Sequence, residues 1–245
     1  MPHQYHPRCY GIVPHSLSFA ECRQYPAVVV TSFANPSFYG RRLRAMLGFA
    51  KNYFPSVLVV TPGYLYRHAY NLLHPEASIS PLLMSLRYER HYIKEMLSQQ
   101  SDILSEPHII QKRWCDFVDK AGHQDFLCAM ENLYNTCSTF QQAIDATTKQ
   151  HLKNNVLVKH DLITTREVDR FLIQHFEEGV TFLLEELAMS LLFVQEGYRC
   201  ILYPGKLFPA LEQLILGQYP DEPEYFTQMI QVHVALRGAK RSIMA

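Results

Sequence analysis

Two runs of β-branched residues dominate the hydrophobic pattern in the first quarter of the chain. Residues 26–31 (PAVVVT) and 56–61 (SVLVVT) lack polar alternation, which is typical of strands buried on both faces of a parallel sheet. Between them, residues 38–51 carry apolar side chains at helical spacing. This order of strand, helix and strand predicts a βαβ unit of a doubly wound sheet.

The remaining pattern is mainly helical, with one more strand. Apolar residues recur at helical spacing over residues 81–99, 121–150, 164–194 and 207–216. Residues 198–203 (YRCILY) predict a third core strand, which Pro204 and Gly205 end. We therefore predict a single Rossmann-like α/β domain over residues 1–245, with a parallel central sheet and a partly flexible N-terminal arm at residues 1–25.

Composition indicates a globular protein and leaves its partner open. Hydrophobic residues make up 48% of the chain and charged residues 19%, which suits a chain that buries a core. Lys plus Arg and Asp plus Glu both count 23, so any site for a polyanion must be a local cluster. The six cysteines contain no CxxC pair, which favours free thiols and gives no metal site. The chain start lacks the regions of a signal peptide and the most apolar predicted helix carries two glutamates, so we expect a cytoplasmic protein without membrane contact. We further expect a monomer.

A local basic cluster lies on the helix predicted for residues 81–99. Its members recur at i, i+3, i+4 and i+7 on one helix face, and we call them the basic stripe: Arg87, Arg90, His91 and Lys94. Arg41, Arg42 and Arg44 form a second cluster on the first predicted helix. Such faces contact phosphates in nucleic-acid-binding proteins, but most charged faces are only solvated, and Glu89 and Glu95 dilute the stripe.

The carboxyl ends of the predicted strands single out two side chains. Ligands of open α/β sheets bind at these ends, where Ser32 follows the first strand and Tyr203 closes the third. Ser32 is therefore a candidate nucleophile, with a turn former or helix cap as the alternative. For Tyr203 the alternative is a core aromatic residue whose hydroxyl is satisfied.

Two adjacent acids lie on the helix predicted for residues 164–194. Glu186 shares a helix face with Phe182 and Leu183, so it points inward with these apolar residues. An unpaired buried carboxylate has a raised pKa, so we expect either an arginine partner or a place beside an ammonium or a transferable proton. Glu185 is turned by about 100° from that face, and we expect it to be a solvated surface acid.

Several familiar catalytic motifs are absent. The ten glycines form neither GxxxxGK[ST] nor GxGxxG, and no HIGH or KMSKS sequence occurs, so we expect no ATP requirement. Ser32 lies in VTSFA rather than in GxSxG. A serine hydrolase or acyltransferase acting on a small ester would still need a histidine base, for which His160 and His175 are the candidates.

Three segments resemble the signatures of the cyclodipeptide synthase family. PAVVVTSFANPSFYG resembles the first, an apolar strand that ends in the catalytic serine, and places Ser32 on that serine. GVTFLLEELA resembles the second and places Glu186 on its glutamate. CILYP resembles the third and places Tyr203 on the second catalytic tyrosine. The three segments span residues 26–204 in the order of the family.

The sequence also departs from the family pattern. Phe182 stands where the family usually has a tyrosine, so the hydroxyl that helps to hold the substrate amine must be missing or come from another residue. Asn35 matches one of two main branches, whereas Tyr203 followed by Pro204 matches the other, the Tyr-Pro branch, to which we assign the chain. Val30 replaces a glycine and would narrow the pocket beside the serine.

The resemblance implies a fold similar to the catalytic domains of class I tyrosyl- and tryptophanyl-tRNA synthetases, without a cofactor. It also implies a ping-pong reaction that joins the aminoacyl groups of two aminoacyl-tRNAs into a cyclodipeptide, a diketopiperazine. Ser32 would carry the first aminoacyl group, Glu186 would hold the α-ammonium and help to take its proton, and Tyr203 would relay a proton during cyclisation.

The resemblance further implies binding sites for the aminoacyl group and for tRNA. The first aminoacyl pocket, transferred by position, would consist of Val28, Val30, Leu58, Val60, Met189 and Ile201. Such a pocket favours an apolar side chain, although all six residues also suit an ordinary core. The basic stripe would meet tRNA phosphates, and a non-catalytic tRNA-binding module is a further alternative.

Overall fold

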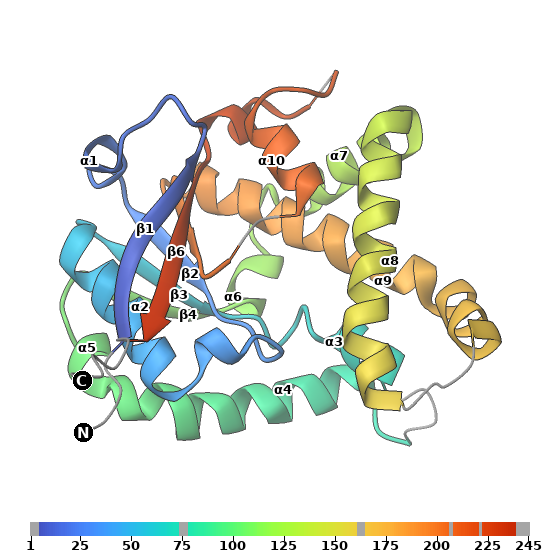
Figure 1. The fold of residues 1–245 in the computed structure, drawn as a ribbon, viewed down its shortest axis with the longest axis horizontal. Helices are drawn as coiled ribbons and strands as arrows, with labels where there is room; N and C mark the ends of the chain where they lie inside the picture. Colours follow the sequence, from blue (N-terminus) through green and yellow to red (C-terminus); the bar gives the residue numbers. More distant parts are fainter. Residues whose placement is uncertain (1–4, 74–77, 161–164, 206–207, 221, 239–245) are drawn as a thin grey trace, which may run out of the picture.

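The computed structural model describes residues 5–73, 78–160, 165–205, 208–220 and 222–238, and its centre is a six-stranded sheet (Figure 1). The strands are β1 (Tyr5–Val13), β2 (Ala27–Val30), β3 (Val57–Thr61), β4 (Ile109–Arg113), β5 (Cys200–Tyr203) and β6 (Ile230–Gly238). Their order is β1-β6-β5-β2-β3-β4, and every neighbouring pair is parallel except β1 with β6. The predicted α/β fold with a parallel central sheet is confirmed.

The helices agree in outline with the predicted ones. They are α1 (Phe19–Cys22), α2 (Gly40–Tyr53), α3 (Arg67–Leu73), α4 (Pro81–Tyr92), α5 (Ser101–Leu104), α6 (Cys115–Val118), α7 (His123–Thr136), α8 (Ser138–His160), α9 (Thr165–Gln195) and α10 (Pro209–Ile215). A π-helical turn (Ile93–Leu97) continues α4. The single helix predicted over residues 121–150 is two helices, because the backbone at Cys137 leaves the helical region (φ −107°, ψ 101°).

The N-terminal segment belongs to the sheet. β1 pairs with β6 from Tyr5, opposite Gly238, to Val13, opposite Gln231. For these residues the expected partly flexible arm is therefore corrected to an edge strand. The signal was weak in the sequence because Pro7 interrupts the segment, and proline is tolerated in a strand chiefly at the edge of a sheet.

Side chains of the central strands alternate between two cores. Val28, Leu58 and Ile201 pack into the core formed with α7, α8, α9 and α10. Val29 and Val59 point the other way, into the core formed with α2. Figure 1 shows the resulting layers, with α2 on one side of the sheet and α8, α9 and α10 on the other.

The order of the strands reverses at β2. This strand lies between β3, the next strand in the chain, and β5, which comes much later. A reversal of this kind leaves a crevice at the carboxyl ends of the strands, where ligands of open α/β sheets bind. Ser32 and Tyr203 lie at these two ends.

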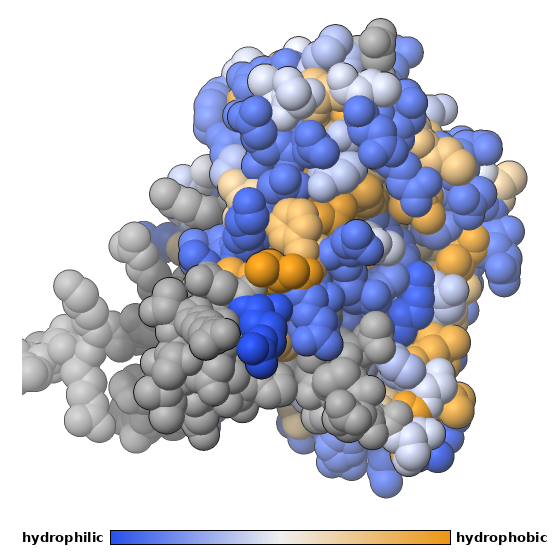
Figure 2. Space-filling view, turned by 90° about the vertical axis from the view of Figure 1, so that its right-hand side faces the viewer, coloured by the Kyte–Doolittle hydropathy of each residue, from blue (hydrophilic) through white to orange (hydrophobic). Residues whose placement is uncertain are grey.

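The face with α8, on the right of Figure 1, is mostly hydrophilic, and apolar residues gather near its middle (Figure 2). No helix within the described ranges is long and apolar enough to cross a bilayer. All six cysteines are free, as their spacing predicts.

Candidate active site

A cavity of about 600 Å³ opens at the carboxyl ends of β2 and β5. Its wall is formed by these strand ends, the loop after β3, and residues of α8, α9 and α10. The polar side chains on this wall include Ser32, Tyr66, Thr147, Gln150, His151, Glu186, Ser190, Tyr203 and Gln231. A largely apolar cavity in which a few polar groups converge is the usual form of a binding site. The fold thus brings Ser32, Glu186 and Tyr203 together from three distant segments.

Ser32 is held on a rigid base. Thr31, the residue before it, is anchored to β3 by its backbone N–H, 2.9 Å from the Val60 carbonyl, and by its hydroxyl, 3.2 Å from the same oxygen. The Ser32 Oγ accepts the backbone N–H of Asn35 at 3.2 Å and lies 2.8 Å from the hydroxyl of Tyr66. The hydrogen bond from the Asn35 N–H is the kind that a turn-forming serine makes, which was the alternative to a nucleophile. The same oxygen nevertheless lines the cavity.

Asn35 connects the serine loop to Tyr203. Its side-chain amide donates to the Tyr203 hydroxyl at 3.4 Å, and its Oδ1 accepts the backbone N–H of Ser37 at 2.9 Å, which caps the short helical turn that follows. Burial raises the pKa of Tyr203, and the hydrogen bond from Asn35 opposes that rise. At neutral pH the phenol is therefore protonated and able to give or pass a proton.

Glu186 faces the cavity as the helix pattern predicts. Phe182 and Leu183, from the same face of α9, line the cavity with it. The described residues give its carboxylate no cationic partner, and desolvation by the surrounding protein raises its pKa to about 7. A cation that enters the cavity would therefore stabilise the ionised form of Glu186.

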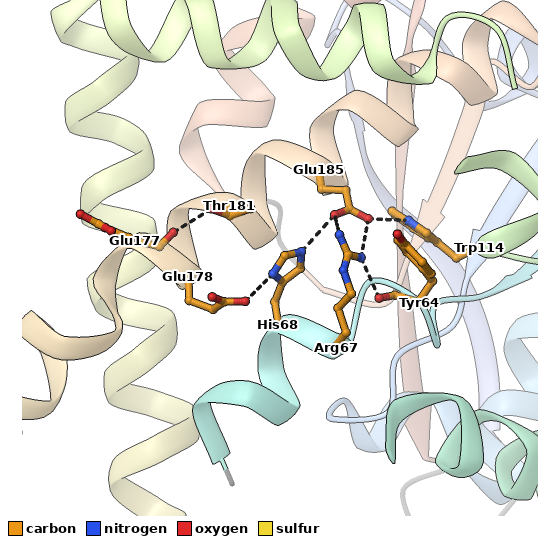
Figure 3. A network of polar contacts seen from close by, with 8 residues as sticks. All are labelled: Tyr64, Arg67, His68, Trp114, Glu177, Glu178, Thr181 and Glu185. Carbon is orange, nitrogen blue, oxygen red and sulfur yellow. Dashed lines mark hydrogen bonds and ion pairs between the residues drawn. The ribbon is translucent and has the colours of Figure 1, made fainter. Parts of the chain in front are cut away.

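Glu185 is the centre of a buried polar network, so its prediction as a solvated surface acid is wrong (Figure 3). Its side chain is 2% exposed, and its two oxygens accept hydrogen bonds from Arg67 at 2.6 and 3.0 Å. The His68 Nε2 lies 3.0 Å from the carboxylate, and the Trp114 indole donates to it at 3.2 Å. Burial alone would raise the pKa of Glu185, but the hydrogen bonds from His68 and Arg67 lower it to about 2.

The predicted aminoacyl pocket divides into two sets. Val30 and Ile201 line the cavity. The other four members lie in the hydrophobic core next to it, at 0–1% exposure, and are Val28, Leu58, Val60 and Met189. The β-branched strands therefore support the cavity more than they line it.

Gln231 on β6 brings an amide to the wall, and no other described residue provides that amide with a hydrogen-bond partner.

The basic stripe is exposed on α4 and the π-helical turn after it. Two aromatic residues of α4, the exposed Tyr88 and the buried Tyr92, have rings 5.1 and 5.2 Å from the ring of Phe33, the residue after Ser32. The stripe thus lies on the helix that packs against the serine loop. Glu89 does not dilute it, because Glu89 is wholly buried and accepts hydrogen bonds from Gly63 and Arg113.

The second basic cluster is largely committed to other contacts. Arg44 forms a bidentate pair with Asp102 at 2.6 and 2.9 Å, and Arg42 donates to the Tyr5 hydroxyl at 3.3 Å. Arg41 is exposed. These contacts leave the basic stripe as the better candidate for phosphates.

Tyr66 is a member of the site that the sequence did not single out. It lies in the loop after β3, where its hydroxyl contacts Ser32 and its ring meets Phe182 edge to face at 6.0 Å. The only available signal was its place just beyond the carboxyl end of a predicted strand, shared with the neighbouring Tyr64. His151 is a second such residue; its ring stacks on Phe182 at 5.8 Å, and burial lowers its pKa.

Comparison with known proteins adds to this geometry. The sequence matches no protein-family model and no curated protein. The structure is similar to that of a CDPS from Fluoribacter dumoffii, with a TM-score of 0.77 at 14% identity over 97% of this chain and 100% of that chain. It is also similar to a cyclodipeptide synthase from Candidatus Glomeribacter gigasporarum bound to Phe-tRNAPhe (TM-score 0.64, 18% identity, 88% of this chain and 90% of that chain).

A third similar structure connects the fold to tRNA synthetases. It is a Mycobacterium tuberculosis protein whose structure is described as demonstrating that cyclodipeptide synthetases are related to type I tRNA-synthetases (TM-score 0.64, 12% identity, 97% of this chain and 96% of that chain). At identities this low the similarity establishes the fold and no more. The chain has the fold of the cyclodipeptide synthases.

Proposed function

We propose that this protein is a tRNA-dependent cyclodipeptide synthase. The observation that carries the proposal is the meeting of Ser32, Glu186 and Tyr203 on one cavity, within the fold of proteins that are named for this activity. The substrates are two aminoacyl-tRNAs, the product is a diketopiperazine, and no ATP is needed because an aminoacyl ester is already activated.

The first step is transfer of an aminoacyl group to Ser32. The Ser32 oxygen attacks the ester carbonyl carbon, the bond to the tRNA ribose oxygen breaks, and the tRNA leaves with a free hydroxyl. Ser32 suits this role because the Asn35 N–H and the Tyr66 hydroxyl fix its oxygen toward the cavity. Val30 and Ile201 give the side chain of the amino acid an apolar wall.

Glu186 acts on the amino group. An α-ammonium entering the cavity supplies the cation that the carboxylate lacks, and this pairing brings the amine close to the acyl carbon. With a pKa of about 7, the carboxylate is also suited to take a proton from the attacking amine. The amine of the seryl-bound aminoacyl group then attacks the ester carbonyl of the second aminoacyl-tRNA, and that tRNA leaves with a free hydroxyl. The product of this step is a dipeptidyl-enzyme, still esterified to Ser32.

Tyr203 assists cyclisation. Its protonated hydroxyl, hydrogen-bonded to Asn35, lies at the end of β5 on the same cavity. It can pass a proton to the serine oxygen as the second amide bond closes the ring. The pair Tyr203 and Pro204 supports assignment to the Tyr-Pro branch.

The basic stripe provides the tRNA contact. It is exposed on the helix that packs against the serine loop, so phosphates bound there would bring the aminoacyl end of a tRNA to the cavity. The similar structure with bound Phe-tRNAPhe supports this partner class.

No observation favours a serine hydrolase. The described contacts of Ser32 are with Tyr66 and with the backbone of Asn35, and none is with a histidine. The His175 ring packs on Phe171 at 4.2 Å and is not among the residues that line the cavity. The side chain of His160 lies outside the described residues.

Expression in a bacterium tests the proposal. Mass spectrometry of the culture medium should detect at least one cyclic dipeptide that is absent from an empty-vector culture and from a culture that expresses Ser32→Ala. Equal products in all three cultures would contradict the proposed activity.

A further inference from the structure

Tyr66 lies against the nucleophile and is fixed there by several contacts. Its hydroxyl is 2.8 Å from the Ser32 Oγ and accepts the backbone N–H of Ala34 at 3.3 Å. Its ring lies 4.7 Å from that of Phe33 and meets Phe182 edge to face at 6.0 Å. The phenol is therefore held on the serine from two sides, by the serine loop and by α9.

The loop that carries Tyr66 is pinned by two buried carboxylates. Before Tyr66, the backbone N–H of Gly63 donates to Glu89 at 2.9 Å, and a Cβ at Gly63 would come within 2.4 Å of the carboxyl carbon of Glu89. After Tyr66, Arg67 forms its bidentate pair with Glu185 (Figure 3). Anchors on both sides keep the hydroxyl in place before a substrate arrives, as an efficient site requires.

The hydrogen bonds around Tyr66 suit a proton relay. Ala34 N–H fills one acceptor position of the phenol, and Asn35 N–H fills one of the Ser32 oxygen. The hydrogen bond between the two hydroxyls can run in either direction. Burial raises the pKa of Tyr66 to about 12, so the phenol keeps its proton at neutral pH and acts as a relay rather than as a base.

We propose that Tyr66 is a catalytic residue of this chain, whose hydroxyl relays the proton of Ser32, and that a hydroxyl on the neighbouring ring of residue 182 can substitute for it. The proposal rests on the proposed synthase activity. As the Ser32 oxygen bonds to the acyl carbon, its proton passes to the Tyr66 oxygen, and the phenolic proton of Tyr66 passes to the departing ribose oxygen. One ester is exchanged for another, the tRNA leaves as an alcohol, and Tyr66 ends protonated as it began.

Single-turnover acylation tests this role. The probe is tRNA charged with a radiolabelled amino acid that wild type incorporates into its product, and the readout is the rate at which acid-stable label appears on the protein. Tyr66→Phe should acylate about 100-fold more slowly, since it removes one oxygen and keeps the ring contacts. Tyr88→Phe is the matched control, because it removes a hydroxyl from the same aromatic cluster that bonds to Tyr39 and not to Ser32.

A second variant distinguishes chemistry from structure. In Tyr66→Phe, adding Phe182→Tyr should restore the acylation rate about tenfold, since it returns a hydroxyl to the cavity. The melting temperature and tRNA affinity of all variants should match wild type. Acylation by Tyr66→Phe within about threefold of wild type would overturn the catalytic role, and a double variant no faster than Tyr66→Phe would overturn the equivalence of the two positions. Absence of label on wild type would instead refute the synthase activity itself.

Discussion

Glu185 and Glu186 are neighbours on one helix, yet their carboxylates have opposite surroundings. Glu185 turns toward α3, where Arg67 and His68 hold it as an anion with a pKa of about 2, and the Trp114 indole, from the segment after β4, also donates to it. Glu186 turns toward the cavity, where no described cation meets it and its pKa rises to about 7. A rotation of about 100° about the helix axis separates a carboxylate with a full set of partners from one that faces the cavity without a described cationic partner.

The partners of a buried carboxylate, more than its burial, indicate whether it has a structural or a binding role. A carboxylate with a full set of partners stabilises an arrangement that already exists, here the contact between α3 and α9. A carboxylate that lines a cavity without a cationic partner reduces the stability of the free protein. A ligand that brings a positive charge into the cavity removes this destabilisation, so such a carboxylate is a candidate binding group. Burial is common to both residues, so the partners decide the role.

The largest effect in free energy is expected from Glu185→Gln. The change keeps the volume but leaves Arg67 and His68 without their shared anion, which should lower the free energy of unfolding by about 3–5 kcal/mol. The melting temperature should fall by about 10 °C. Glu177→Gln is the control, because Glu177 is exposed on the same helix and should change stability by less than about 0.5 kcal/mol. Equal stability of Glu185→Gln and wild type would contradict the assignment of Glu185 as a structural anchor.

The next effect is an opposite pH dependence of stability at the two positions. Glu185 has a pKa depressed from 4.5 to about 2, so its contribution is present above pH 4.5 and is lost as the pH falls toward 2. Glu186 has a pKa raised from 4.5 to about 7, so its contribution is full below pH 4.5 and is lost as the pH rises through 7. Urea unfolding at pH 8 should therefore find Glu186→Gln more stable than wild type by up to about 3 kcal/mol, with the difference vanishing near pH 4. A constant difference across this range would contradict the assignment of a raised pKa to Glu186.

The third effect is on activity. Glu186→Gln should form cyclic dipeptide at least about 100-fold more slowly, equivalent to about 2.7 kcal/mol, because the amide cannot pair with the amine or take its proton. Its melting temperature at neutral pH should not fall. Product measured by mass spectrometry within about threefold of wild type would move Glu186 from the chemistry to the structure of the cavity.

The sequence predicted the strands that matter most for the site. The β-branched runs define β2 and β3 because strands buried on both faces carry no polar alternation, and their carboxyl ends locate Ser32. β4 escaped notice because its last residues are polar and largely exposed at the sheet edge. β6 has polar Gln231 and His233 on its cavity side, which weakened the apolar signal.

The partners of the polar residues could not be predicted in the same way. Helix periodicity correctly predicted that Glu186 points inward. It carries no information about α3, which covers the neighbouring face of α9, so Glu185 was wrongly predicted to be exposed to solvent. The contacts of Glu185 come from residues more than 70 positions away, and Tyr66 reaches Ser32 from 34 positions away. Such pairings depend on how the loops return to the sheet, which the hydrophobic pattern of a single segment does not encode.

The most direct test of the account is covalent labelling of Ser32. After incubation with tRNA charged with a radiolabelled amino acid and an acid quench, wild type should carry one ester-linked aminoacyl group, and Ser37→Ala should carry the same label. Ser32→Ala should carry none while binding tRNA with unchanged affinity, because the substitution removes a single oxygen from a preformed site. Label that persists on Ser32→Ala, or wild type that never becomes labelled under conditions of turnover, would contradict the account.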